Sequence, residues 1–171
     1  MEPRELRFAG SRFDCGRLNA VYVQRLRSVQ AEYNAASAAI SYVNRHWQRQ
    51  NIPQEVGRLK PGDFVRANEN LESTYLIRLY AEFEGILKDH LATNHATTRV
   101  PDKPKVDWLI KRVAQTEDVS VEMALRIKMD ALRDYRNSIT HHTRHFAPFV
   151  SLNDALSSLN TFVARLPNPY A

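Results

Sequence analysis

A hydrophobic seam in the first third of the chain most constrains what this sequence can fold into. Apolar and aromatic side chains recur at alternating spacings of four and three residues through Tyr22, Leu26, Val29, Tyr33, Ala36, Ile40, Val43 and Trp47. This spacing places all of them on one face of a long helix over residues 18–49. Such a face needs a partner helix. We expect that partner to come from the same domain, although the length also leaves room for contact with a second chain.

A second helix is expected after a loop. Two prolines and two glycines interrupt residues 51–70, and Asn70 suits the N-cap position of the helix that follows. The buried face of this helix is expected to hold Tyr75, Leu79, Phe83, Ile86 and Leu87. Charges at the margins of such a face are often only solvated. Arg78 is nevertheless a candidate for substrate binding, and Glu82 and Glu84 are candidates for positioning the residues that contact the substrate.

Three further segments carry helical patterns, and none shows convincing strand alternation. A short helix is expected at residues 106–113, and a longer one follows it. Ser151, with Asp154 three residues later, resembles a capping box and marks the start of the last helix. The sequence therefore predicts an all-α bundle of four or five helices, with an N-terminal extension at residues 1–17 and a single domain at residues 18–171.

Composition limits the classes of partner and compartment. The net charge of +5 and the preference for Arg over Lys favour anionic partners such as RNA. Cys15 is the only cysteine, which excludes an intramolecular disulfide and a multi-cysteine metal site. The charged N-terminal residues lack signal-peptide character, and no apolar run approaches the ~20 residues of a membrane span. We therefore expect a cytoplasmic protein that does not bind membranes.

The segment ALRDYRNSITHHTRH, residues 131–145, carries residues suited to RNA cleavage. It places Arg136, Asn137 and His141 at R-N-x-x-x-H spacing. Attack of RNA by its own 2′-hydroxyl requires a group that titrates near neutrality, and a fixed cation beside the phosphate where negative charge builds up. His141 and Arg136 are the candidates for these two roles.

This spacing resembles the signature of ribonucleases in the HEPN superfamily, whose small α-helical domains carry an R-x4–6-H motif, often with Asn after the Arg. The resemblance implies a HEPN-like bundle that cleaves single-stranded RNA as a homodimer, without metal or cofactor, and leaves 2′,3′-cyclic phosphate ends. Many members are toxins or act in antiviral defence. The resemblance also implies that Arg136 stabilises the phosphorane, His141 transfers protons and Asn137 positions one of them.

Two details of the motif bear on its use. His142 offers an alternative R-x5-H register, so it competes with His141 for the catalytic role. One branch of the family has a tyrosine two residues after the histidine, which nucleotidyltransferase antitoxins modify, whereas Thr143 stands there in this chain. An antitoxin or regulatory protein would therefore have to act in another way.

The position of Arg136 needs an explanation, because on an ideal helix it falls within an apolar stripe formed by Leu125, Met129, Leu132 and Ile139. Either it forms a buried ion pair with Glu82 or Glu84, or it faces a cleft or an interface. On the same ideal helix His141 projects about 140° away from Arg136. Either the helix bends or ends near residues 138–140, or a second copy supplies the facing group. We favour the second copy.

The polar side of the same helix suits an RNA-backbone track. Asn137 and His141 share a face, and the additional candidates for binding RNA there are Arg133, His142, Arg144 and His145. An ordinary solvated helix face is the alternative. His141 and His145 are also four residues apart, as metal ligands often are, but no third ligand stands out, so no metal site is expected.

Two function classes follow from these patterns. The first is a dimeric, metal-independent endoribonuclease in a toxin or defence setting. The second is a non-catalytic HEPN-type module that binds RNA, nucleotide or a partner protein. A third, weaker class is a coiled-coil scaffold built on the seam at residues 18–49.

Overall fold

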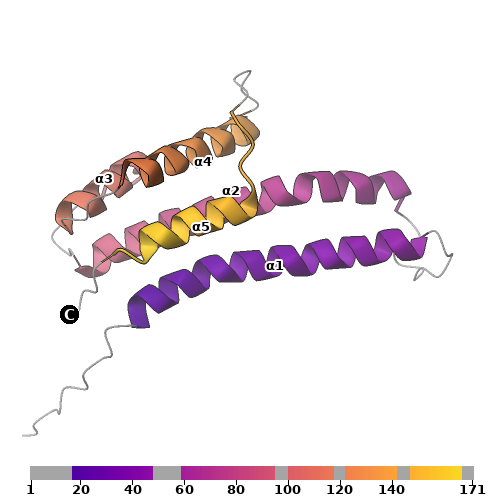
Figure 1. Cartoon of the computed structure of the whole chain (residues 1–171), viewed down its shortest axis with the longest axis horizontal. Helices are drawn as coiled ribbons and strands as arrows, with labels where there is room; N and C mark the ends of the chain where they lie inside the picture. Colours follow the sequence, from indigo (N-terminus) through magenta and orange to yellow (C-terminus); the bar gives the residue numbers. More distant parts are fainter. Residues whose placement is uncertain (1–16, 48–58, 95–99, 118–121, 142–146, 167–171) are drawn as a thin grey trace, which may run out of the picture.

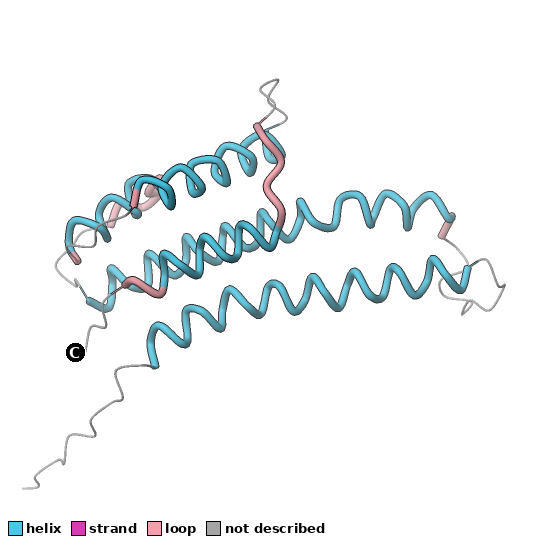
Figure 2. Tube along the Cα trace, in the orientation of Figure 1, coloured by secondary structure: helices cyan, strands magenta, loops and turns pink. Residues whose placement is uncertain are grey.

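The computed structural model describes residues 17–47, 59–94, 100–117, 122–141 and 147–166, and within them it contains five α-helices and no strand (Figure 1 and Figure 2). The helices are α1 (Arg17–Trp47), α2 (Pro61–Asn94), α3 (Val106–Thr116), α4 (Met123–His141) and α5 (Leu152–Val163). The predicted all-α bundle is therefore confirmed. None of these five helices is both long enough and apolar enough to cross a lipid bilayer. Apart from Arg17, the predicted N-terminal extension lies outside the described residues.

The two longest helices, α1 and α2, run antiparallel and side by side (Figure 1). Tyr22, Leu26 and Val29 from the predicted seam are buried, and the other seam residues with described side chains are partly buried. Because α1 packs on α2 and α5, the seam finds its partner within the chain, as expected. Arg25 adds an ion pair across the helices, with its Nε 2.5 Å from Oε1 of Glu82.

The expected start of α2 at Asn70 was wrong, because the helix begins at Pro61. Proline suits the first helical position, where its missing N–H would have no partner in any case. Asp63 stabilises this start: its Oδ2 accepts a hydrogen bond from the backbone N–H of Lys60 at 2.8 Å, as an acidic residue does in a capping box. Asn70 lies inside the helix, and its carbonyl accepts a hydrogen bond from the Thr74 hydroxyl at 2.8 Å.

The core forms where α5 lies against α2, between α1 and α4. The rings of Phe83 and Phe162 meet edge to face at 5.6 Å between centroids, and both side chains are buried. The predicted helix start at Ser151 is confirmed, since Oγ of Ser151 accepts a hydrogen bond from the backbone N–H of Asp154 at 3.1 Å, while the Asp154 carboxylate accepts from the Ser151 hydroxyl at 2.7 Å. This cap satisfies a backbone donor that would otherwise have no partner within the helix.

Helix α4 carries the R-N-x-x-x-H motif at its C-terminal end. Leu125, Met129 and Leu132 are buried against the rest of the bundle, as the apolar stripe predicts. The helix continues through His141, one residue past the range 138–140 where a bend or an end was one of the expected alternatives. The Thr140 hydroxyl donates to the backbone carbonyl of Arg136 at 2.8 Å, a type of contact that often bends a helix slightly.

Candidate functional site

A cleft of about 470 Å³ opens where α2, α3 and α4 meet. Its walls are formed by Tyr80, Glu84, Pro104, Lys105, Val106, Asp107, Arg133, Arg136 and Asn137. The structure thus brings two residues of the motif, Arg136 and Asn137, into a cavity large enough for a small molecule or part of a polymer. The predicted supporting residue Glu84 lines the same cavity.

Arg136 is held in this cleft without a carboxylate partner among the residues that the structure places. Its guanidinium carbon lies 5.6 Å from the centre of the Tyr80 ring, within the range of a cation–π contact. Its Nη1 donates to Oδ1 of Asn137 at 3.0 Å. Its Nε is buried and finds no hydrogen-bond acceptor among those residues. Arg136 therefore forms no ion pair within the described part of the molecule.

The alternative of a buried ion pair between Arg136 and a glutamate of α2 was wrong for both candidates. Glu82 pairs with Arg25 on α1, and Oε1 of Glu84 accepts from Nζ of Lys88 at 2.8 Å, one turn along α2. Both carboxylates are therefore engaged by other cations.

Tyr80 forms the aromatic wall beneath Arg136 and is buried. Burial raises the pKa of its phenol well above the usual value, and the nearby carboxylate of Asp107 raises that pKa further. The phenol therefore stays neutral throughout the physiological range. A neutral ring offers its electron-rich face to the guanidinium and adds no negative charge that would compete with a bound phosphate.

Arg133, predicted to bind RNA, is surrounded by three carboxylates. Its Nη1 donates to the two oxygens of Asp107 at 2.7 and 2.8 Å and to Oδ1 of Asp130 at 3.0 Å, while its Nη2 lies 3.0 Å from Oδ1 of Asp134. The hydrogen bond with Asp107 is the main cause that raises the pKa of Arg133, and the contact with Asp134 adds to it against the effect of burial. This side chain joins α4 to α3, and its charge is already matched before any ligand arrives.

Two of the other predicted residues lie away from the cleft. Arg78 forms a two-pronged ion pair with Glu32 of α1, in which Nη2 lies 2.9 Å from Oε1. Glu82 likewise faces α1 through Arg25. Positions 78 and 82 are one turn apart on α2 and share a side of the helix, whereas Glu84 is rotated toward α3 and α4. The expectation that Arg78 and Glu82 belong to one site with Arg136 was therefore wrong.

The motif segment also holds three histidines, His141, His142 and His145. His141 is the last residue of α4, and its side chain lies outside the described residues. The same holds for His142, Arg144 and His145, so their predicted parts in catalysis, RNA binding or a metal site stay predictions. In the described ranges, no three His, Cys, Asp or Glu side chains gather as metal ligands would.

Five residues of the cleft were not predicted from the sequence, and three of them have polar or charged side chains: Tyr80, Lys105 and Asp107. Tyr80 precedes Glu84 by one helical turn, and this spacing was the available sign that both share a face of α2. Lys105 and Asp107 come from the start of α3, and only the packing of α3 on α2 brings them to the motif. Comparison of the chain with models of protein families, with curated proteins and with solved structures finds no match.

Proposed function

We propose that this protein is a metal-independent endoribonuclease that cleaves single-stranded RNA by 2′-hydroxyl attack and leaves a 2′,3′-cyclic phosphate. We further propose that it acts as a homodimer in the cytoplasm, as a toxin or an effector of antiviral defence. The observation that carries the proposal is the state of Arg136: a guanidinium in a cleft, with a buried, unsatisfied Nε and no carboxylate partner among the described residues.

The chemistry asked of Arg136 follows from that state. A cation already paired with a carboxylate offers little to a phosphate, as Arg133 illustrates. An unpaired guanidinium has N–H donors for any phosphate that enters the cleft, and its charge opposes the negative charge that grows on the phosphorane. Asn137 holds one of its nitrogens in place through the 3.0 Å hydrogen bond. His141 then supplies the group that moves protons near neutral pH.

The dimer in this proposal follows from the course of α4. Because the helix runs through His141, that residue leaves the axis about 140° away from Arg136 on ideal geometry. The stripe that His141 shares on an ideal helix also contains Met123 and Ile127, which are 72% and 61% exposed. Two large apolar side chains on the outer face of α4 suit contact with a second copy, which would bring its own motif to the shared surface.

A second candidate function is binding without cleavage, in which case the protein is a module for RNA, nucleotide or a partner protein. The contact of Arg136 with the Tyr80 ring favours this candidate, because a cation–π contact stabilises the fold as well as it prepares a site. The two candidates differ in what replacing Arg136 changes. A structural Arg136 contributes to stability, whereas a functional one contributes to cleavage.

The test uses Arg136→Ala and Arg136→Lys, with Arg78→Ala as the matched control. Arg78 is also an arginine, but it pairs with Glu32 outside the cleft. We expect Arg136→Ala to lower RNA cleavage about 100-fold or more, as loss of a donor to transition-state charge does. Arg136→Lys should not restore it, since an ammonium cannot make a two-pronged contact. Arg78→Ala should cleave as the wild type does.

Three results would count against the proposal. One is full activity in Arg136→Ala. Another is loss of activity in Arg78→Ala equal to that in Arg136→Ala. The third is a protein that sediments as a monomer at micromolar concentration and still cleaves RNA, which would remove the composite site.

A further inference from the structure

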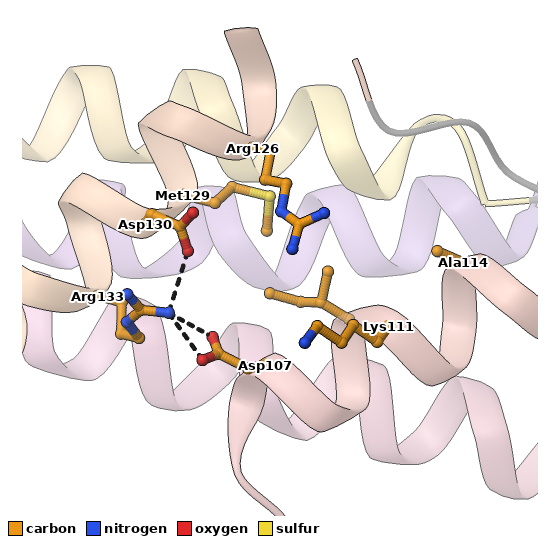
Figure 3. Close-up of a pocket in the computed structure, with 8 residues that line it drawn as sticks. Asp107, Lys111, Ala114, Arg126, Met129, Asp130 and Arg133 are labelled. Atoms are coloured by element: carbon orange, nitrogen blue, oxygen red, sulfur yellow. Dashed lines mark hydrogen bonds and ion pairs between the residues drawn. The ribbon is translucent and has the colours of Figure 1, made fainter. Parts of the chain in front are cut away.

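A second groove, of about 350 Å³, lies between α3 and α4 (Figure 3). Its lining residues are Asp107, Ile110, Lys111, Ala114, Arg126, Met129, Asp130 and Arg133. It shares Asp107 and Arg133 with the cleft that holds Arg136, so the two cavities adjoin at this ion pair. Its volume lies in the range of small-molecule sites.

Two cations face this groove from opposite helices. Lys111 extends from α3 and Arg126 from α4 into the space between the helices (Figure 3). Neither side chain makes an ion pair with any acidic residue in the described ranges. Two like charges across a small cavity repel each other, and an anion bound between them would remove that repulsion.

Lys111 and Arg126 form no ion pair in the described ranges, although acidic residues stand one helical turn from each of them. Asp107 precedes Lys111 by four residues, and Asp130 follows Arg126 by four, but both carboxylates are held by Arg133. Glu122 precedes Arg126 by four and pairs with Arg165, whose Nη2 lies 2.9 Å from its Oε1. The packing of the bundle thus pairs the neighbouring carboxylates with Arg133 and Arg165, and Lys111 and Arg126 keep no ion pair in the described ranges.

The other residues that line the groove indicate which chemical groups a ligand would carry besides an anion. Ile110, Ala114 and the buried Met129 form an apolar surface beside the cations. A methionine thioether packs well against aromatic rings. At the opposite end, the carboxylates of Asp107 and Asp130 accept from Arg133 but keep lone pairs for hydroxyl or amino donors. The groove therefore combines an anion site, an apolar wall and hydrogen-bond acceptors.

We infer that this groove binds a nucleoside phosphate, with the phosphate between Lys111 and Arg126 and the base against Met129. Ribose or exocyclic amino groups donate toward Asp130. A free nucleotide and a nucleotide within an RNA strand present the same chemistry. Continuity with the Arg136 cleft makes a strand that crosses both cavities the expected source, and in that form the inference rests on the proposed function.

The first experiment is calorimetric titration of the full chain with the four nucleoside 5′-monophosphates, the matching nucleosides and inorganic phosphate. We expect a monophosphate to bind more tightly than either the nucleoside or phosphate alone. Lys111→Gln and Arg126→Gln should each weaken binding about tenfold or more, since each removes a charged hydrogen bond. Lys128→Gln, an equal change of charge two residues along α4 and outside the groove, should alter binding less than about twofold.

The inference is overturned if Lys111→Gln and Arg126→Gln bind the monophosphates as Lys128→Gln does. It is also overturned if inorganic phosphate binds as tightly as a nucleotide, which would reduce the groove to an anion site. Absence of binding to both the monophosphates and a single-stranded oligonucleotide would overturn it as well.

A second titration separates this inference from the proposed cleavage. A single-stranded 2′-deoxy oligonucleotide, which has no attacking hydroxyl, is bound to Arg136→Ala protein with and without the Lys111 and Arg126 substitutions. Weaker binding with the substitutions supports the groove whether or not the protein cleaves RNA. If wild-type protein cleaves RNA but the groove substitutions change neither affinity nor KM, nucleotide binding by the groove is contradicted and the proposed ribonuclease activity is not. Tighter binding of monophosphates than of the oligonucleotide would identify the free nucleotide as the source.

Discussion

Replacing Arg133 with alanine tests whether the charges around the two cavities are organised as described. The side chain is 28% exposed, and its partners Asp107, Asp130 and Asp134 are 44%, 48% and 57% exposed. Partly exposed ion pairs contribute about 0.2–1 kcal/mol each after solvent screening. Removal of the shared cation also leaves three carboxylates that repel one another. We therefore expect Arg133→Ala to lower the free energy of unfolding by about 1–2 kcal/mol at low salt.

The assay is urea denaturation followed by far-ultraviolet circular dichroism, at low and at high salt. Arg126→Ala is the matched control, because Arg126 lies two turns earlier on α4 and has no acidic partner in the described ranges. Its free energy of unfolding should change by less than about 0.5 kcal/mol. The difference between the two variants should shrink at high salt, since salt screens the carboxylates. Equal free energies of unfolding in the two variants would refute the assignment of Arg133 to a structural ion-pair network. A difference between them that is the same at low and at high salt would refute it as well.

Three further predictions concern the core, a helix cap and pH. Phe83→Ala should destabilise the protein by about 3–5 kcal/mol in the same denaturation assay, because the ring is fully buried against Phe162; a loss of less than about 1 kcal/mol would place it outside the core. Ser151→Ala should cost about 1 kcal/mol through loss of the hydrogen bond from the Asp154 N–H, and Ser151→Asn should recover most of it; equal losses in both variants would show that the cap contributes nothing. Tyr80 has a raised folded-state pKa, so its contribution to stability is present below the unfolded-state pKa of about 10 and is lost as pH rises through the folded-state value. Alkaline denaturation of wild type and Tyr80→Phe should therefore diverge above about pH 10, with the variant less sensitive, and identical profiles would contradict the burial of this phenol.

Features encoded by local periodicity or local capping were predictable from the sequence. The seam on α1 required a partner helix, and the Ser151 cap marked the start of α5, both without knowledge of the fold. The start of α2 was missed because prolines and glycines signal both loops and helix starts. The decisive contact there is the hydrogen bond from the backbone N–H of Lys60 to the Asp63 carboxylate, which the composition of the segment does not reveal.

The candidate site was only partly predictable. The apolar stripe of α4 indicated that Arg136 needs a cleft or a partner, and the structure places it in a cleft with Asn137 and Tyr80. The pairing of acids with bases was not predictable, because each cation has several carboxylates within reach. Asp107 stands four residues before Lys111, a spacing that suits an ion pair within α3, but the carboxylate of Asp107 pairs with Arg133 of α4 instead. Tertiary contacts therefore decide which cations stay free for a ligand.

The measurement that tests the central claim most directly is cleavage of single-stranded RNA in excess EDTA, with end-group analysis of the products. Wild-type protein is compared with His141→Ala, after circular dichroism has verified that the variant is folded. The account predicts metal-independent products with 2′,3′-cyclic phosphate ends from the wild type and none from the variant. Cleavage that persists unchanged in His141→Ala, or wild-type protein that cleaves no RNA at micromolar concentration, would contradict it.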